Sequence, residues 1–435
     1  MNNESWRNRS SAAVWHPCTQ MKSLENLPLV PIARAEGVWL HDFDGNRYLD
    51  AVSSWWVNLF GHGNPRINAA LRDQLNKLEH VMLAGFTHEP VVELSEKLGV
   101  LTGLGHAFYG SDGASATEIA LKMSFHYWRN TGKPQKSCFV SLNNSYHGET
   151  VGALSVTDVA LFKDTYAPLL RQSVQMPSPD WRLAEEGESA EEYALRCAEA
   201  LDGYLVGHHG EIAALILEPL VQGAAGMAMY HPAYLKQARA LCDRYAVHLI
   251  ADEIAVGFGR TGTMFACEQA GIRPDFICVS KGITGGYLPL SAVLTTDTVY
   301  QAFYDDSVTR GFLHSHSYTG NALACRAALA TLAIFEEDDI LNANRGRQAK
   351  MNAALQPLCD MPVAHLRNTG MIWAFDVVDA PADFPHRFYQ EALAHGLLLR
   401  PIGNTVYFMP PYVISDDEIA WLACQTIAVL RKVMG

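Results

Sequence analysis

The chain has 435 residues, of which 49% are hydrophobic and 18% are charged, and 33 Lys and Arg against 46 Asp and Glu residues give a formal net charge of -13. This composition indicates a soluble globular protein with two or three structural units and excludes extensive disorder. The negative charge, together with the lack of a basic cluster, makes nucleic acid a poor partner.

The chain carries no pattern typical of a membrane or secreted protein. The most apolar candidate for a membrane helix, residues 213–230, is interrupted by Glu218, Pro219 and Gln222, whereas such a helix needs roughly 18 uninterrupted apolar residues. The polar start, residues 1–11, lacks the apolar segment of a signal peptide. Nine cysteines are scattered singly, which favours reduced thiols over disulfides or a zinc site. We therefore expect a cytosolic protein.

The N-terminal region predicts a β-hairpin followed by a helix. Residues 37–41 and 47–51 flank the turn Asp44-Gly45-Asn46, a typical hairpin signal. Asn64 and Pro65 are typical of a helix start, and apolar residues then recur at helical spacing as far as Leu78.

Short apolar runs alternate with helical segments from about residue 107 to residue 294. The runs cover residues 107–109, 138–140, 212–217, 247–251, 276–279 and 290–294. Continuous apolar strands separated by helices predict a mainly parallel sheet covered on both faces. Ligands of such sheets gather at the carboxyl ends of the strands.

The pattern changes after Gly320. Two long helices are predicted at 322–335 and 340–358, then short strands at 372–375 and 406–409, and a terminal helix from Asp416. This indicates a second, smaller α+β domain that also includes the N-terminal hairpin. We therefore assign residues 1–60 and 321–435 to the small domain and residues 61–320 to a large cofactor-binding domain.

Reactive side chains follow two of the predicted strands. Asp252 comes directly after residues 247–251, and Lys281 follows residues 276–279 and precedes a turn of small residues. Either side chain alone is typical of a protein surface. Together they suggest a Schiff-base site, in which a lysine amine condenses with an aldehyde and an acid lies opposite.

Pyridoxal phosphate needs such a lysine, a carboxylate for its pyridine nitrogen and a phosphate cradle. Residues 111–115 follow a strand and open a helix, whose free backbone N–H groups can hold a phosphate. Tyr146, at another strand end, can stack on a flat cofactor. Residues 257–262 match the dinucleotide pattern G-x-G-x-x-G but open no convincing helix directly after a strand. We interpret that match as coincidental.

The combination of residues 249–254, 257–260, 274–275 and 280–282 resembles the signature of the class III pyridoxal-phosphate aminotransferases. The resemblance implies an α/β protein of fold type I, with a mainly parallel, seven-stranded sheet in the large domain, and a homodimer with shared active sites. It implies pyridoxal 5'-phosphate as the cofactor, Lys281 as the Schiff-base lysine and proton carrier, Asp252 as the partner of the pyridine nitrogen, and Tyr146 as the stacked ring. The implied phosphate contacts are Gly113, Ala114 and, from the other subunit, His316 and Ser317.

Further motifs at residues 15–17, 54–56, 230–232, 400–401 and 407–412 resemble the members of this family that serve biotin synthesis. Their reaction is the amination of 8-amino-7-oxononanoate to 7,8-diaminononanoate, with S-adenosylmethionine as the usual donor, in a ping-pong cycle through pyridoxamine phosphate. A long apolar substrate that ends in a carboxylate needs aromatic walls and an arginine. The implied substrate residues are Trp55, Trp56, Tyr146, Ser315, Arg400, Tyr407, Arg260 and Cys18.

The amino donor stays open from the sequence. Ala224 and Tyr407 stand where members that use glutamate carry a glutamate and an arginine, which disfavours a reaction linked to 2-oxoglutarate. Cys18 and Glu149 replace a tyrosine and an aspartate that are usual in the biotin branch. The alternatives are an ω-amino acid:pyruvate aminotransferase and, more remotely, a non-catalytic cofactor- or dinucleotide-binding protein that uses residues 257–262.

Overall fold

The computed structural model describes residues 1–27 and 29–435. They form two compact units: Met1–Pro65 with Arg345–Gly435, and Arg66–Asn344. The sequence-based division, at 60/61 and 320/321, leaves helix α11 (Ala322–Glu337) in the small domain. In the structure this apolar helix is largely buried and packs on α4 (Glu89–Thr102) of the larger unit.

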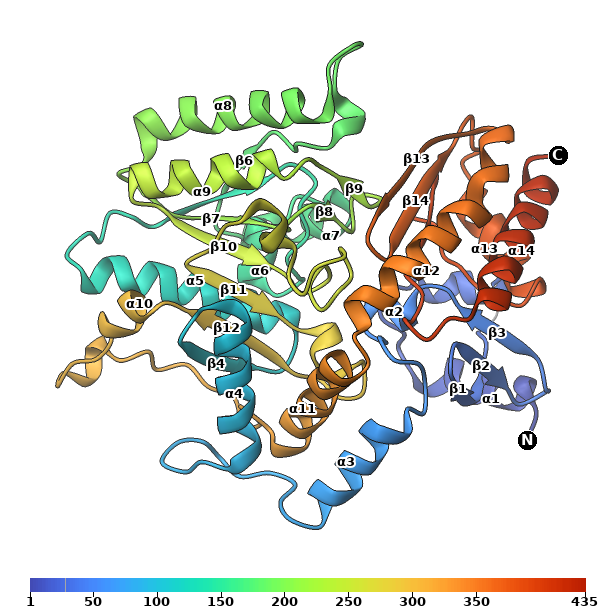
Figure 1. Cartoon of the computed structure of the whole chain (residues 1–435), viewed down its shortest axis with the longest axis horizontal. Helices are drawn as coiled ribbons and strands as arrows, with labels where there is room; N and C mark the ends of the chain where they lie inside the picture. The colour runs from blue at the N-terminus through green and yellow to red at the C-terminus, as the bar shows by residue number, and fades with distance from the viewer. Residues whose placement is uncertain (28) are drawn as a thin grey trace. The chain divides into compact units, whose positions relative to one another are not determined.

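A seven-stranded sheet forms the centre of the larger unit (Figure 1). Its order is β4 (His106–Gly110), β12 (Ser291–Thr295), β11 (Phe276–Val279), β10 (His248–Asp252), β7 (Ile212–Leu217), β5 (Cys138–Leu142) and β6 (Val174–Met176). Strands β11, β10, β7, β5 and β6 run parallel, and β12 is antiparallel to both of its neighbours. The expected mainly parallel sheet is therefore confirmed.

Helices cover this sheet. Helix α5 (Gly113–Asn130) buries residues at helical spacing, Ala116, Ile119, Ala120 and Met123, in one cluster with apolar residues of the central strands. Helices α8 (Ala190–His208) and α9 (Ala233–Tyr245) lie side by side (Figure 1). The remaining α-helices and short strands described in this region are α3 (Pro65–Leu75), α6 (Val151–Val156), α7 (Ala160–Lys163), α10 (Asp297–Gln301), β8 (Val221–Gln222) and β9 (Ala228–Met229).

The smaller unit holds two sheets. One has the order β1 (Ile32–Glu36), β2 (Trp39–Asp42), β3 (Arg47–Asp50), β15 (Leu397–Leu398), and the other β13 (Val363–Thr369), β14 (Ile372–Val377), β16 (Thr405–Phe408). Strands β2 and β3 form the predicted hairpin, and β15 pairs with β3, so residues from both ends of the chain share one sheet. Its described α-helices are α1 (Asn3–Ala13), α2 (Ser53–Trp56), α12 (Ile340–Leu355, which begins in the larger unit), α13 (Phe384–Ala394) and α14 (Asp416–Met434).

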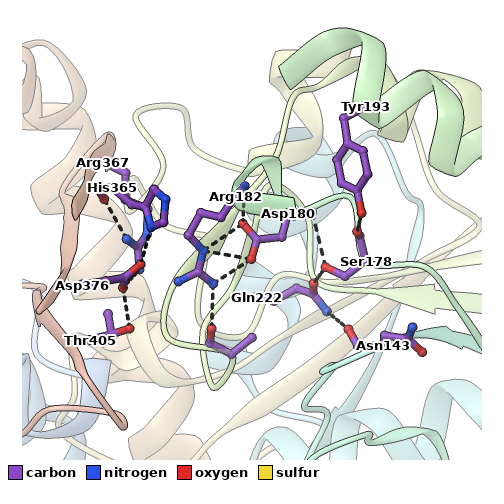
Figure 2. Close-up of polar contacts among 11 residues, drawn as sticks. Asn143, Ser178, Asp180, Arg182, Tyr193, Gln222, His365, Arg367, Asp376 and Thr405 are labelled. Atoms are coloured by element: carbon purple, nitrogen blue, oxygen red, sulfur yellow. Dashed lines mark hydrogen bonds and ion pairs between the residues drawn. The ribbon is translucent and has the colours of Figure 1, made fainter. Parts of the chain in front are cut away.

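A polar network joins the three strands of the second sheet (Figure 2). Asp376 accepts hydrogen bonds from Arg367 Nη2 at 3.0 Å and from Thr405 Oγ1 at 2.7 Å. Burial alone would raise the pKa of Asp376, but the Arg367 charge and these hydrogen bonds lower it to about 2. The carboxylate therefore stays ionised inside the sheet.

In the part of the chain that the structure describes, no helix combines the length and the apolar character needed to cross a bilayer.

A buried histidine predicts how stability depends on pH. The His248 ring packs on Trp128 and Phe276, its Nδ1 lies 2.9 Å from Ser124 Oγ, and burial lowers its pKa from 6.5 to about 4. The His248 imidazole of the unfolded chain therefore binds a proton more readily than that of the folded chain. As the pH falls from 6.5 toward 4, the free energy of unfolding should decrease by up to about 3 kcal/mol.

Urea unfolding of the wild type and of His248→Phe between pH 7 and pH 4.5 measures this contribution. The variant lacks the Ser124 contact at every pH, but its free energy of unfolding should decrease less than that of the wild type between pH 7 and pH 4.5. Equal acid sensitivity in the two proteins would contradict the assignment.

Candidate active site

The predicted reactive residues meet at one edge of the large sheet. Strands β7, β10 and β11 are parallel neighbours, with Ala251 opposite Leu217 and Asp252 opposite Cys278. Their carboxyl ends therefore lie together. Asp252 is the last residue of β10, Glu218 directly follows β7, and Lys281 comes two residues after β11.

Asp252 is 4% exposed and is held on both oxygens. Its Oδ2 lies 2.7 Å from His147 Nδ1, and its Oδ1 accepts from the Ile254 N–H at 3.1 Å. Within residues 1–27 and 29–435, His147 Nε2 is buried without a hydrogen-bond partner. His147 thus presents one nitrogen to Asp252 and keeps the carboxylate in one orientation.

Lys281 begins the short 3-10 helix η5 (Lys281–Thr284) with a φ of +46°, in the left-handed region that non-glycine residues rarely adopt. Burial lowers the pKa of Lys281 to about 8, although the charges of Asp252 and Glu218 act in the opposite direction. The amine is therefore partly neutral near pH 7 to 8, as a nucleophile or a proton carrier requires.

Glu218 is a member of this cluster that the sequence did not identify. It is 5% exposed; its Oε2 accepts from the Tyr146 N–H and its Oε1 from the Gly223 N–H, both at 3.0 Å. Burial raises the pKa of Glu218 to about 7, with the His147 charge lowering it and the Asp252 charge raising it. The only signal in the sequence was its place at the end of an apolar strand.

Tyr146 lies at the edge of the cluster. Its hydroxyl donates to Glu149 Oε1 at 2.9 Å, and its ring meets that of Phe162 edge-on, with the centroids 5.6 Å apart. The glutamate that replaces the usual aspartate thus contacts the tyrosine.

The N-terminus of α5 adjoins the same cluster. Asp112 caps the helix by accepting from the Ser115 N–H at 2.8 Å, while the amides of Gly113 and Ala114 stand at the very start of the helix, where N–H groups have no intrahelical acceptor. A Cβ on Gly148 would lie 2.6 Å from Ala114 Cβ, and one on Gly113 would lie 3.0 Å from Ile254 Cγ2. The predicted phosphate cradle therefore packs tightly against two segments: the residue that follows His147, and Ile254, two residues after Asp252.

Ser315, His316 and Ser317 lie in a largely exposed turn rather than in the buried cluster. His80 Nε2 is 2.7 Å from the carbonyl oxygen of Ser317, and the His316 N–H donates to Thr319 Oγ1 at 3.2 Å. Arg260 is 1% exposed and lies in residues 257–262, which form turns, as expected for a coincidental match to the dinucleotide pattern.

The other predicted substrate residues belong to the smaller unit. Trp56 Nε1 donates to the Tyr407 hydroxyl at 3.2 Å. Burial raises the pKa of Tyr407 to about 12, against the effect of the nearby Arg400 charge. Trp55 is 52% exposed, and Cys18 is also exposed. Trp56, Tyr407 and Arg400 thus form one group.

The two tryptophans lie in a left-handed turn. The φ angles of Ser53, Ser54, Trp55 and Trp56 are 51°, 47°, 74° and 72°. Asp50 holds the turn, because its Oδ1 accepts from the Ser54 N–H at 2.8 Å and its Oδ2 accepts from Ser54 Oγ at 2.7 Å. Ser53 Oγ also donates to the Met409 carbonyl at 2.6 Å.

Comparisons with known proteins agree with this geometry. The family model "Aminotransferase class-III" matches residues 20–430. The chain is 47% identical over 427 residues to the adenosylmethionine-8-amino-7-oxononanoate aminotransferase of Helicobacter pylori, covering 96% of each chain. It is similar to the crystal structure of the enzyme of that name from Methanocaldococcus jannaschii, with a TM-score of 0.93, 35% identity and 99% of each chain covered. It is also similar to an amine transaminase of an uncultivated Pseudomonas species in its PLP-bound form, with a TM-score of 0.92, 32% identity, and 97% of this chain and 99% of that chain covered.

The contact of Gly148 with Ala114 yields a test of the cradle. Gly148→Ala places a methyl group against Ala114 at a φ of +121°, so it should displace the start of α5 and cost about 2 kcal/mol or more of stability.

Gly203→Ala is the matched control, because a Cβ there meets no atom within 4 Å and the residue lies inside α8. It should be neutral or stabilise the protein by about 0.5–1 kcal/mol. Urea unfolding of both variants measures the difference, and equal midpoints would show that the contact carries no constraint.

Proposed function

Because the chain belongs to the class III aminotransferase family, we propose that it aminates 8-amino-7-oxononanoate to 7,8-diaminononanoate in biotin biosynthesis, with pyridoxal 5'-phosphate as its cofactor. The observation that carries the proposal is the near full-length similarity to enzymes of that name, combined with a buried lysine and carboxylate at neighbouring strand ends.

The larger unit has the groups that this cofactor requires. The amides of Gly113 and Ala114 at the start of α5 would hold the phosphate, and the Tyr146 ring would lie against the flat pyridine. His147 orients Asp252, and that carboxylate would pair with the protonated pyridine nitrogen. When bound, pyridoxal phosphate supplies an electron sink and carries the amino group between the two half-reactions.

Lys281 would carry the proton in both half-reactions. With a pKa of about 8 its amine exists in both protonation states near neutral pH, so it can accept a proton from the carbon that bears the donor amine and later return one to the acceptor. The left-handed backbone at Lys281 fixes where the side chain leaves the strand end.

The smaller unit supplies residues suited to a long, apolar substrate with a terminal carboxylate. Trp55 and Trp56 would line the apolar chain, and Arg400, near the Tyr407 hydroxyl, would bind the carboxylate. Ser315, Arg260, Tyr146 and Cys18 complete the proposed set.

S-adenosylmethionine is the proposed amino donor, following the names of the relatives. Ala224 offers no carboxylate at the position that glutamate-using relatives fill with glutamate. The second candidate is an ω-amino acid:pyruvate aminotransferase, favoured by the similarity to the Pseudomonas amine transaminase. An ω-amino acid:pyruvate aminotransferase would not require the Trp55–Trp56 pair together with Arg400, so these residues favour the first candidate.

We also propose a cytosolic homodimer in which His316 and Ser317 reach the phosphate of the partner's site. Large apolar side chains are exposed around this turn, at Tyr304, Val308, Leu313 and Tyr318. A second copy of the chain would remove them from water.

Replacing Lys281 tests the cofactor assignment. Lys281→Ala should abolish turnover and the visible absorption that develops when pyridoxal phosphate reacts with the wild type, because the reacting amine is gone. Lys236→Ala, at an exposed position of α9, is the control and should retain both. A Lys281→Ala variant that still turns over would refute the proposal.

Substrate identity is tested on the enzyme loaded with the amino group. The wild type should release that group to 8-amino-7-oxononanoate in preference to pyruvate, and S-adenosylmethionine should bleach the visible band where lysine does not. Arg400→Gln should raise the KM for 8-amino-7-oxononanoate by roughly 10- to 100-fold through loss of the carboxylate contact. Preferential reaction of the wild type with pyruvate would favour the second candidate.

A further inference from the structure

We propose that Glu218 is a positioning residue of this active site, which fixes the backbone of Tyr146 to the end of β7 and adds a second negative charge to the surroundings of Lys281. The inference rests on the proposed function and concerns a residue outside every site motif of the sequence.

The first argument is the pattern of hydrogen bonds. The two oxygens of Glu218 accept from the amides of Tyr146 and Gly223, which belong to different loops. The two bonds span 72 residues and 5 residues of the chain. Both amides need an acceptor atom, and a carboxylate offers two. A glutamine offers only one acceptor oxygen, so its NH2 group would point at one of the two backbone N–H groups, donor against donor. The ionised carboxylate therefore suits this place better than its amide.

The second argument is that the turn around Gly223 has hydrogen bonds of its own that do not involve Glu218. Gln222 Nε2 donates to the Asn143 carbonyl at 3.0 Å and its Oε1 accepts from Ser178 Oγ (Figure 2). Arg182 Nη2, paired with Asp180, donates to the Ala225 carbonyl at 3.1 Å. A substitution at Glu218 should thus leave this turn folded and release mainly Tyr146.

The third argument is electrostatic. The Glu218 charge raises the pKa of Lys281, and Glu218 itself responds to the charges of His147 and Asp252. Tyr230 also contacts Glu218, because its hydroxyl donates to the Glu218 backbone carbonyl at 2.6 Å. Asp252 at the end of β10 and Glu218 at the Tyr146 loop thus supply two carboxylates that offset the tendency of burial to neutralise the lysine.

Glu253 provides a matched control. It is fully buried, its two oxygens accept from the Ala266 and Cys267 amides at 2.9 Å, and burial raises its pKa to about 7. Its bonds lead to the 3-10 helix η4 (Ala266–Ala270) instead of the Tyr146 loop. Glu253→Gln therefore shows how far the loss of any buried carboxylate changes amide exchange and the Lys281 pKa.

The test uses the full chain, freed of cofactor. Amide hydrogen exchange is followed at residues 146 and 223, and the pH dependence of Lys281 acylation gives the pKa of its amine. In Glu218→Gln the amide of residue 146 should exchange about tenfold faster or more, and the pKa of Lys281 should fall. In Glu253→Gln both readings should match the wild type.

Glu218→Asp separates the two roles and also serves if the glutamine variant does not fold. It retains the charge but is one methylene shorter, so both amides should exchange faster while the pKa of Lys281 stays closer to the wild-type value. Wild-type exchange at residue 146 in both Glu218 variants, or a Lys281 pKa unchanged in Glu218→Gln, would overturn the inference.

The proposed function is judged separately, from the visible absorption of wild type with pyridoxal phosphate. If the wild type develops this band and the Glu218 variants behave like Glu253→Gln, only the positioning role fails. If the wild type develops no band, the proposed function itself fails, whatever the exchange data show.

Discussion

A carboxylate withdrawn from water at the end of β10 sets the requirements for its neighbours. Burying a charge without partners is costly, so Asp252 needs donors and opposite charge inside the protein. His147, the Ile254 amide and the lysine after β11 meet this need. They can do so because parallel strands deliver their carboxyl ends to one edge. The parallel direction of the strands is therefore what brings the partners of Asp252 together.

Close packing carries this arrangement from the sheet to the helix that begins at Gly113. Gly148 leaves no room for a side chain against Ala114, and Gly113 lies against Ile254. The start of α5, the loop after β5 and the turn after β10 are thus in direct contact. A displacement of any of them is transmitted to the others, because a densely packed interior does not absorb such changes.

Much of this could be predicted from the sequence, because Asp252 and Lys281 each follow a continuous apolar strand within a specific motif. The central strands and several of the long helices followed from the same periodicity, whereas α1, α4, α13, β6 and β13 were not predicted. Glu218 could not be identified, because one of its partners, Tyr146, is 72 residues away and becomes a neighbour only in the folded sheet. The antiparallel direction of β12 was equally hidden, since a buried apolar strand looks alike in either direction. The left-handed turn at Ser53–Trp56 had no signal either, because none of its residues is glycine.

That turn has a consequence for any molecule that contacts its indoles. Four non-glycine residues in the left-handed region cost roughly 1–2 kcal/mol each. The hydrogen bonds that Ser54 donates to Asp50, and that Ser53 donates to the Met409 carbonyl, offset part of this cost when the unit folds. The backbone beneath both indoles is therefore ordered before a ligand arrives. Little conformational entropy of that backbone remains to be lost on association, so contact with the tryptophans can contribute to affinity with a small ordering penalty.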